Sequence, residues 1–299
     1  MQTLFDGYLI VDWSANNRPK TGKDSIWWCL TEWQAGSLVI RDVQNPATRQ
    51  LALQQILSIL LQYLNTNKRI LLGFDFSYAY PSGFAEAMVL EEMPAWLAIW
   101  RYMFTHVKDG PSNNNNRFDV ATQMNMHLSA GPAPFWGCPE RLQNTYLSMK
   151  KPKGRQANLF AEYRLAEQGN RTHSTWKLSY AGAVGSQTLT GLPYLYRLRT
   201  DTRLQDVSKV WPFETGLRTI THDDLRGVHI LHAEIYPSLV SPVYGETEIK
   251  DAAQVQALAM YFADLDYQAM LGRLFAGIRV LSEQERSIIE NEEGWILGI

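Results

Sequence analysis

The stretch Tyr8-Leu9-Ile10-Val11-Asp12-Trp13-Ser14 runs from apolar residues into a single acid. The apolar run predicts a mostly buried β-strand. A carboxylate in such a strand must be hydrogen-bonded, paired with a cation or bound to a metal, because burying it alone costs several kcal/mol. Asp12 can therefore brace the turn that follows, or it can face a metal ion or a phosphate group.

Two more strands and a helix follow this stretch. Residues 25–30 and 38–43 are dense in apolar and aromatic side chains, and short turns containing Asn, Pro or Gly precede them. Connections this short predict an antiparallel meander with residues 8–14. A stripe of Leu and Ile at 3.6-residue spacing over 51–64 then predicts a helix.

Residues 69–76 form the next apolar run, which also carries one acid near its end, Asp75. A strand reached through a helix should lie parallel to the first strand by a right-handed crossover. Three meander strands, a helix and a fourth strand are the opening of the ribonuclease H-like fold, in which strand four pairs with strand one. Asp12 and Asp75 would then be neighbours, and a divalent cation is the usual remedy for their repulsion.

The rest of the chain alternates between helical and strand-like segments. Residues from about 84 to 205 are mainly helical in pattern, strands return at 207–213 and 228–237, and a helix follows at 250–265. We find no linker or internal repeat, so 1–299 is expected to be one domain with a helical insertion. The predicted fold class is α/β: a ribonuclease H-like mixed sheet, with an antiparallel three-strand meander plus parallel strands, flanked by helices.

Four acids from separate core elements form the candidate site: Asp12, Asp75, Glu234 and Asp251. The first three end apolar strands, and the fourth opens a helix on its packed face. Hard oxygen ligands favour Mg²⁺ or Mn²⁺ over zinc. Two such ions about 4 Å apart would activate a water and stabilise the leaving oxygen in phosphodiester cleavage.

In this interpretation Asp12 is the bridging ligand, while Asp75 and Asp251 each hold one ion. Glu234 would bind metal or orient the attacking water. The competing interpretation is that two or more of these acids only cap or brace structural elements, since structural networks also hold perturbed carboxylates.

Polar and basic residues elsewhere offer contacts for a phosphate group. Ser14 can donate to Asp12, to a metal-bound water or to a phosphate. The most basic run, 150–155, is either a solvated loop or a phosphate clamp at the rim of a groove. The clamp residues would be Lys151, Lys153 and Arg155. A Gly-containing lead into a helix at 182–187 can also hold a phosphate, although its spacing is not that of a Walker A or dinucleotide motif.

Composition limits the class of protein. The 299 residues carry a net charge of −2, so no global basic field draws the chain to nucleic acid. Two widely separated cysteines, Cys29 and Cys138, indicate neither a disulfide framework nor a zinc site and favour a reducing, cytoplasmic location. We see no signal peptide and no apolar run of the ~20 residues that a membrane span requires.

Ordered motifs link this chain to a known family. They are Val11-Asp12-Trp13-Ser14-Ala15, Gly73-Phe74-Asp75-Phe76, Tyr80-Pro81-Ser82-Gly83-Phe84, Ala183-Val184-Gly185-Ser186-Gln187, Gly191-Leu192-Pro193, Ala233-Glu234-Ile235-Tyr236-Pro237 and Lys250-Asp251-Ala252-Ala253. In order and spacing, over about 8–297, the chain resembles the DUF429 family of predicted ribonuclease H-like nucleases. The resemblance implies that fold and a nuclease activity inferred from it.

Fold alone does not fix the reaction, because the same architecture also hosts kinases, ATPases and transposases. The leading hypothesis is a metal-dependent nuclease or phosphodiesterase that acts on nucleic acid. A second is an actin-like ATP-dependent phosphotransferase or phosphohydrolase, in which Asp12, Ser14 and the turn 15–23 face the nucleotide phosphates. A third is a non-catalytic binding protein that keeps the fold.

Overall fold

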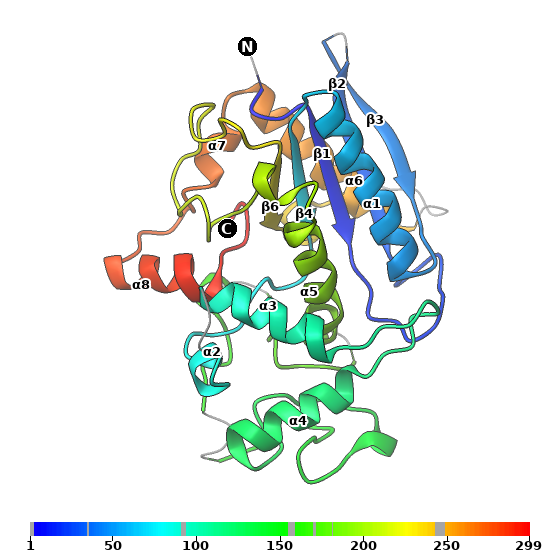
Figure 1. The fold of residues 1–299 in the computed structure, drawn as a ribbon, viewed down its shortest axis with the longest axis vertical. Helices are drawn as coiled ribbons and strands as arrows, with labels where there is room; N and C mark the ends of the chain where they lie inside the picture. Colours follow the sequence, from blue (N-terminus) through cyan, green and yellow to red (C-terminus); the bar gives the residue numbers. More distant parts are fainter. Residues whose placement is uncertain are drawn as a thin grey trace.

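The chain folds around one six-stranded mixed sheet with helices on both faces (Figure 1). This computed structural model describes residues 3–34, 36–90, 94–154, 159–169, 172–180, 182–242 and 249–299. The strand order is β3-β2-β1-β4-β6-β5. The strands are β1 Gly7–Asp12, β2 Trp27–Gln34, β3 Ser37–Gln44, β4 Ile70–Phe74, β5 Ser208–Val210 and β6 Ile230–Glu234. The predicted α/β class with antiparallel and parallel strands is confirmed.

The first four strands follow the predicted connections. β1 and β2 are antiparallel, as are β2 and β3, whose pairing shifts between Leu30 and Thr31. The helix α1, Arg49–Asn65, begins at Thr48, whose hydroxyl accepts a hydrogen bond from Leu51 N. This helix carries the chain over to β4, which lies parallel to β1. The ends of β1 and β4 therefore meet at one edge of the sheet.

Alternating side chains of these strands build two cores. Leu9 and Val11 of β1 belong to the core that also contains α1 and α5, Val184–Thr200. Tyr8 and Ile10 belong to the opposite core, which contains α6, Lys250–Tyr267. In Figure 1 the helices α1 and α5 accordingly lie on one side of the sheet and α6 on the other. This period of two is what a sheet buried on both faces requires.

The expected insertion, 84–205, contains most of the remaining helices. They are α2 Phe84–Ala87, α3 Ala95–His106, α4 Arg117–Ser129 and α5, with short 3₁₀ turns at Glu140–Leu142 and Leu165–Glu167. The sequence pattern of 157–168 predicts a helix, but from 159 onward the described part is bends and one 3₁₀ turn. That turn is held by Arg164, whose buried side chain forms an ion pair with Glu167 instead of lying on a helix surface.

The end of the chain closes the second core. β5 is shorter than the predicted strand 207–213, because Pro212 has no backbone N–H to donate to a ladder. After α6 the chain forms α7 Leu271–Leu274, α8 Glu283–Ile288 and a π turn Ile289–Glu293. One 3₁₀ turn, Gln205–Val207, precedes β5, and another, Pro237–Leu239, follows β6. A capping box of Ser282 and Glu285 begins α8, as a Ser followed three residues later by a Glu predicts. Within the residues that the structure describes, no helix has the length and apolar character to cross a membrane.

Candidate functional site

Asp12 and Asp75 lie side by side where β1 and β4 end. The strands pair in register up to Val11 and Phe74, so Asp12 and Asp75 follow them as neighbours, and the charge of Asp75 raises the pKa of Asp12. The backbone N–H of Trp13 donates to Asp75 Oδ1 at 2.7 Å, so the end of one strand fixes the acid of the other. Asp12 and Asp75 are therefore neighbours in the structure, as the sequence predicts.

The environment of this pair favours its neutral form. Burial raises the pKa of Asp12 well above its usual value, and the carboxylates of Asp75 and Asp251 raise this pKa further. Burial also raises the pKa of Asp75, although the hydrogen bond from Trp13 N–H opposes the shift. Ionising these acids together is therefore unfavourable in the folded chain, and a cation that binds here would relieve the repulsion.

Asp251 approaches the pair from the first turn of α6. The packed face of this helix holds the buried side chains of Val255, Leu258 and Phe262, as the helical periodicity predicts. Asp251 Oδ2 accepts a hydrogen bond from the backbone N–H of Asp24 at 2.7 Å. Asp264, on the other side of the same helix, is exposed as predicted. The structure therefore brings Asp12, Asp75 and Asp251 together.

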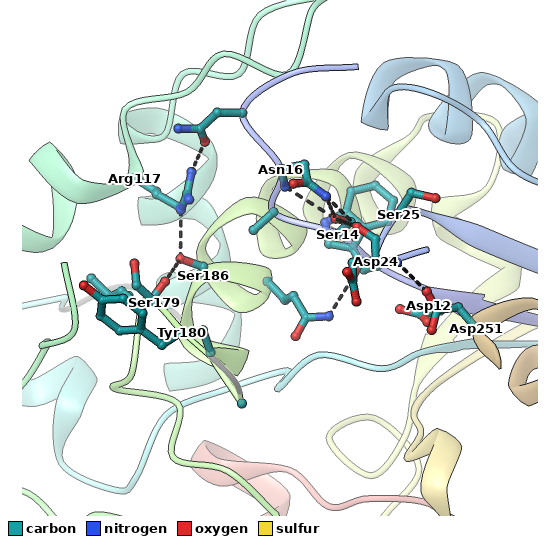
Figure 2. Close-up of a pocket in the computed structure, with 17 residues that line it drawn as sticks. Asp12, Ser14, Asn16, Asp24, Ser25, Arg117, Ser179, Tyr180, Ser186 and Asp251 are labelled. Atoms are coloured by element: carbon teal, nitrogen blue, oxygen red, sulfur yellow. Dashed lines mark hydrogen bonds between the residues drawn. The ribbon is translucent and has the colours of Figure 1, made fainter. Parts of the chain in front are cut away.

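A cavity of about 690 Å³ opens beside this cluster and is lined by Asp12 and Asp251. Asp12, Asp24 and Asp251 form one end of its lining. Arg117 and Tyr180 belong to the other end, as Figure 2 shows. Ser14, Asn16 and Asn17 of the turn after β1 also line the cavity, as do Gly182, Ala183, Ser186 and Gln187 at the start of α5. The cavity therefore has an acidic end and a cationic end.

Glu234 does not join this cluster. It is buried on the opposite face of the sheet, where its Oε1 lies 2.5 Å from Arg164 Nη2 and its Oε2 accepts a hydrogen bond from Arg164 Nη1 at 2.8 Å. Burial raises the pKa of Glu234, and Arg164 opposes that shift. Its Oε2 also accepts the backbone N–H of Tyr78 at 2.8 Å. The structure thus places Glu234 as an anchor for the loop that follows Asp75.

The same buried network holds the rest of that loop. Glu293 accepts a hydrogen bond from Ser82 N through Oε1 and one from Leu165 N through Oε2, at 2.8 and 2.6 Å. Arg164 also binds Glu167 and the backbone carbonyl of Glu293. The Arg164 guanidinium therefore joins the turn at Leu165–Glu167 and the C-terminal segment to Glu234, which binds the loop after β4. This network holds the backbone that directly follows Asp75.

The predicted phosphate contacts fall in different places. Ser14 lines the cavity, but its hydroxyl donates to Asp24 O at 3.3 Å and accepts from Asn16 Nδ2 at 2.7 Å. Lys151 forms an ion pair with Glu162 and does not line the cavity. Lys153 is exposed in the same loop, and Arg155 lies outside the described residues.

Two positioning residues are not signalled by the sequence. Arg49, wholly buried at the start of α1, binds Asp109 through Nε and Nη2 and donates from Nη1 to the carbonyls of Ser14 and Asn16, both at 2.9 Å. It thereby fixes the turn that leaves Asp12. Gln187 of α5 donates from Nε2 to Trp13 O at 2.5 Å and reaches Asp75 Oδ2 at 3.5 Å. Both link residues far apart in the sequence, which local pattern does not reveal.

The donor chemistry of the acid cluster fits Mg²⁺ or Mn²⁺, since all three side chains offer hard carboxylate oxygens. The charges that act most strongly on Asp12 are those of Asp75 and Asp251, and both raise its pKa. As they stand, however, no three His, Cys, Asp or Glu side chains among the described residues are arranged to hold a metal ion. The hydrogen bond from Asp24 N–H to Asp251 would have to yield, or a water would have to bridge, for all three acids to act together.

Comparison with protein-family models, with curated proteins and with solved structures finds no match to this chain.

Proposed function

We propose that the chain is a metal-dependent phosphodiesterase, acting as a nuclease, on a ribonuclease H-like fold of the DUF429 kind. The observation that carries the proposal is that Asp12 and Asp75 lie side by side at the ends of two parallel neighbouring strands, with Asp12 and Asp251 lining one cavity. The strand order β3-β2-β1-β4 supports the ribonuclease H-like assignment, since it puts these two acids where that fold carries them.

In this proposal Asp12 and Asp75 are the principal ligands for Mg²⁺ or Mn²⁺, and Asp251 is the third. A bound ion of this kind neutralises charge on a phosphoryl oxygen and lowers the pKa of a bound water. The protein's own contribution is orientation. Gln187 and the N–H of Trp13 hold the carboxylate of Asp75 in place, and the buried cluster disfavours two free charges until a cation is present.

Hydrolysis by purified protein tests the proposal. With Mn²⁺ or Mg²⁺, the wild-type chain should cleave RNA, DNA, hybrid or branched substrates. Asp12→Asn and Asp251→Asn should each abolish cleavage, because each substitution removes a ligand charge from the cluster. Asp264→Asn is the matched control on the same helix as Asp251, since the Asp264 side chain is exposed. Cleavage that survives Asp12→Asn, or that Asp264→Asn also removes, would contradict the assignment.

The cavity also favours a second candidate, ATP-dependent phosphoryl transfer. Its volume of about 690 Å³ is within the range of small-molecule sites, and it has an acidic and a cationic end. An Mg²⁺·nucleotide complex would match that polarity. Stabilisation by ATP with Mg²⁺ but not by oligonucleotides, together with phosphate release from ATP, would favour this candidate over the nuclease.

A further inference from the structure

Arg117 is a buried cation that lines the cavity. It is the first residue of α4 and has 8% of its surface exposed. Its Nε donates to Ser186 Oγ at 2.8 Å, and its Nη1 donates to the side chains of Asn17 and Asn115. In the part of the chain that the structure describes, Arg117 forms no ion pair and its Nη2 has no hydrogen-bond partner.

A guanidinium so placed is costly unless an anion compensates it. Burial lowers the pKa of Arg117 to about 10, and the nearby charge of Arg49 acts in the same direction. Asp109, the nearest acid that opposes this shift, is already bound by Arg49 in a bidentate pair. Because Arg117 lines the cavity, an anion in the cavity could supply the missing charge.

The start of α5 adds a second attraction for an anion at the same place. This 17-residue helix has no acid in its first turn, and its N-cap residue, Ala183, provides no side-chain cap. Gly182, Ala183 and Ser186 line the cavity, and the hydrogen bond from Arg117 to Ser186 joins the guanidinium to this first turn. The N–H groups of Gly185 and Ser186 already donate to Lys177 O and Ala183 O, so the attraction for an anion here is the partial positive charge of the helix N-terminus.

Tyr180 provides an aromatic surface at the same end. Its side chain is 61% exposed and lines the cavity, on the side of Arg117 in Figure 2. Its backbone φ of 69° lies in the left-handed region, which bulky residues rarely adopt. Strained residues of this kind gather at functional sites, and exposed rings beside basic groups stack with nucleic-acid bases.

We propose that Arg117 and the first turn of α5 form a subsite for a phosphate group of the substrate, and that Tyr180 stacks against the adjoining base. This inference rests on the proposed function and names its substrate class: a nucleotide unit whose reacting phosphate lies at Asp12 and Asp75 while another phosphate lies at Arg117. The second phosphate comes either from the next position of a polynucleotide strand or from a nucleoside triphosphate. Both sources combine phosphate with a base.

Binding without metal tests the subsite separately from catalysis. The probes are inorganic pyrophosphate, ATP and a fluorescein-labelled thymidine hexanucleotide, each titrated in EDTA. Wild type should bind pyrophosphate and at least one of the two base-bearing probes. Tighter binding of the hexanucleotide than of ATP identifies a strand as the source, and the reverse identifies a nucleoside triphosphate. Wild type that binds none of the three overturns the subsite.

The decisive variant is Ala183→Asp. Asp is a favoured N-cap residue and its charge suits a helix N-terminus, so the substitution should preserve stability while the added charge repels an anion at this place. Affinity for every probe that wild type binds should fall roughly tenfold or more, the order expected for losing a charge-assisted contact. Ala183→Ser caps the helix without the charge, and its loss should be clearly smaller. Equal affinity of Ala183→Asp and wild type would overturn the subsite.

Three further variants separate the parts of the subsite. Arg117→Gln should weaken all the probes, whereas Arg226→Gln, at an exposed arginine outside the cavity, should bind as wild type does. Tyr180→Ala should weaken only ATP or the hexanucleotide and leave pyrophosphate unchanged. If Tyr180→Ala reduces pyrophosphate equally, the stacking role is wrong.

Titration with Mn²⁺ alone keeps the two proposals distinguishable. Ala183→Asp should leave the Mn²⁺ affinity of the wild type unchanged, since Ala183 forms none of the hydrogen bonds that hold Asp75 and Asp251. Wild type that binds the probes but neither binds Mn²⁺ nor hydrolyses them would remove the phosphodiesterase and retain the subsite. Wild type that binds Mn²⁺ but no probe would remove the subsite and retain the metal centre.

Discussion

Glu234 of β6 pairs with Phe74 of β4, one residue before Asp75. Successive residues of a strand face opposite sides of a sheet, so Glu234 shares the face of Phe74. Asp12 follows Val11, which pairs with Phe74 from the other side, and its carboxyl group faces Asp251 on α6. The acids that end β1 and β6 therefore lie on different faces of the sheet. Asp12 lines the cavity, and Glu234 binds the buried Arg164.

Glu234→Gln should destabilise the protein and leave Mn²⁺ binding intact. Gln still accepts the N–H of Tyr78 but removes the charge that pairs with Arg164. We expect a loss of about 3 kcal/mol in the free energy of unfolding, near the low end for a broken buried pair, because Glu167 remains beside Arg164. Urea unfolding measures the stability and calorimetry with Mn²⁺ measures the affinity. Unchanged stability with lost Mn²⁺ affinity would make Glu234 a ligand after all.

Asp12→Asn should produce the reverse pattern, with higher stability in EDTA and no stabilisation by Mn²⁺. Because the folded state raises the pKa of Asp12, the wild type loses stability as the pH rises through that folded-state pKa, whereas Asn does not ionise. The stability gained by the substitution should therefore grow from pH 5 to pH 8. Urea midpoints of the two proteins over this range give the comparison. A stability difference between the two proteins that stays constant over this pH range would mean that the folded state does not raise the pKa of Asp12.

Local pattern was sufficient for the strands that carry the first two acids. The apolar run before Asp12, the similar run before Asp75 and the helix between them predict a parallel pair, and the pair is present. The 3.6-residue period likewise assigns Asp251 to the packed face of its helix. For Glu234 the pattern gave the strand but not its register, and a slip of one residue changes the face.

Local sequence pattern does not predict ion pairs between residues that are far apart in the chain. Arg49 and Asp109 are 60 residues apart in the chain, and Arg164 and Glu234 are 70 apart. Most arginines are exposed, and Arg is rarely buried without a partner. A single arginine in a loop or at the start of a helix is therefore expected at the surface. The basic run at 150–155 led to the prediction of a phosphate clamp. The basic residue that lines the cavity is instead Arg117, which is buried and isolated in the sequence.

Arg49→Lys should reduce both stability and Mn²⁺ affinity, because Arg49 positions the turn after Asp12. Lys keeps a charge near Asp109, but its single ammonium cannot replace the planar fork that also holds the carbonyls of Ser14 and Asn16. We expect a stability loss of about 3 kcal/mol. Calorimetry with Mn²⁺, under conditions where the variant is folded, reports the effect on the site.

Arg199→Lys is the matched control for this substitution. Arg199 also binds a carboxylate through two nitrogens, those of Glu214 at 2.8 and 2.5 Å, but away from the cavity and partly exposed. Its replacement should cost less stability and leave Mn²⁺ affinity unchanged. If both variants bind Mn²⁺ as the wild type does, Arg49 is purely structural.

His232 should make the protein sensitive to mild acid. Its ring is buried in β6, with Nε2 hydrogen-bonded to Ser208 Oγ at 2.8 Å, while Nδ1 has no partner among the described residues. Burial and, to a smaller extent, the charge of Arg199 lower the pKa of His232 to about 3. In the unfolded chain the ring takes up a proton near pH 6.5, so its contribution to stability is complete above that pH and is lost as the pH falls toward 3.

The size of this effect follows from the linkage relation, about 1.4 kcal/mol for each pH unit below 6.5, or roughly 2 kcal/mol by pH 5. Other buried acids contribute slopes of their own, so the informative quantity is the difference between wild type and His232→Asn. Urea unfolding at pH 7 and pH 5 should show the wild type losing about 2 kcal/mol more than the variant. His229→Asn, at a partly exposed position just before the same strand, should retain the wild-type difference. Parallel pH curves for wild type and His232→Asn would show that the His232 ring can take up a proton inside the folded sheet.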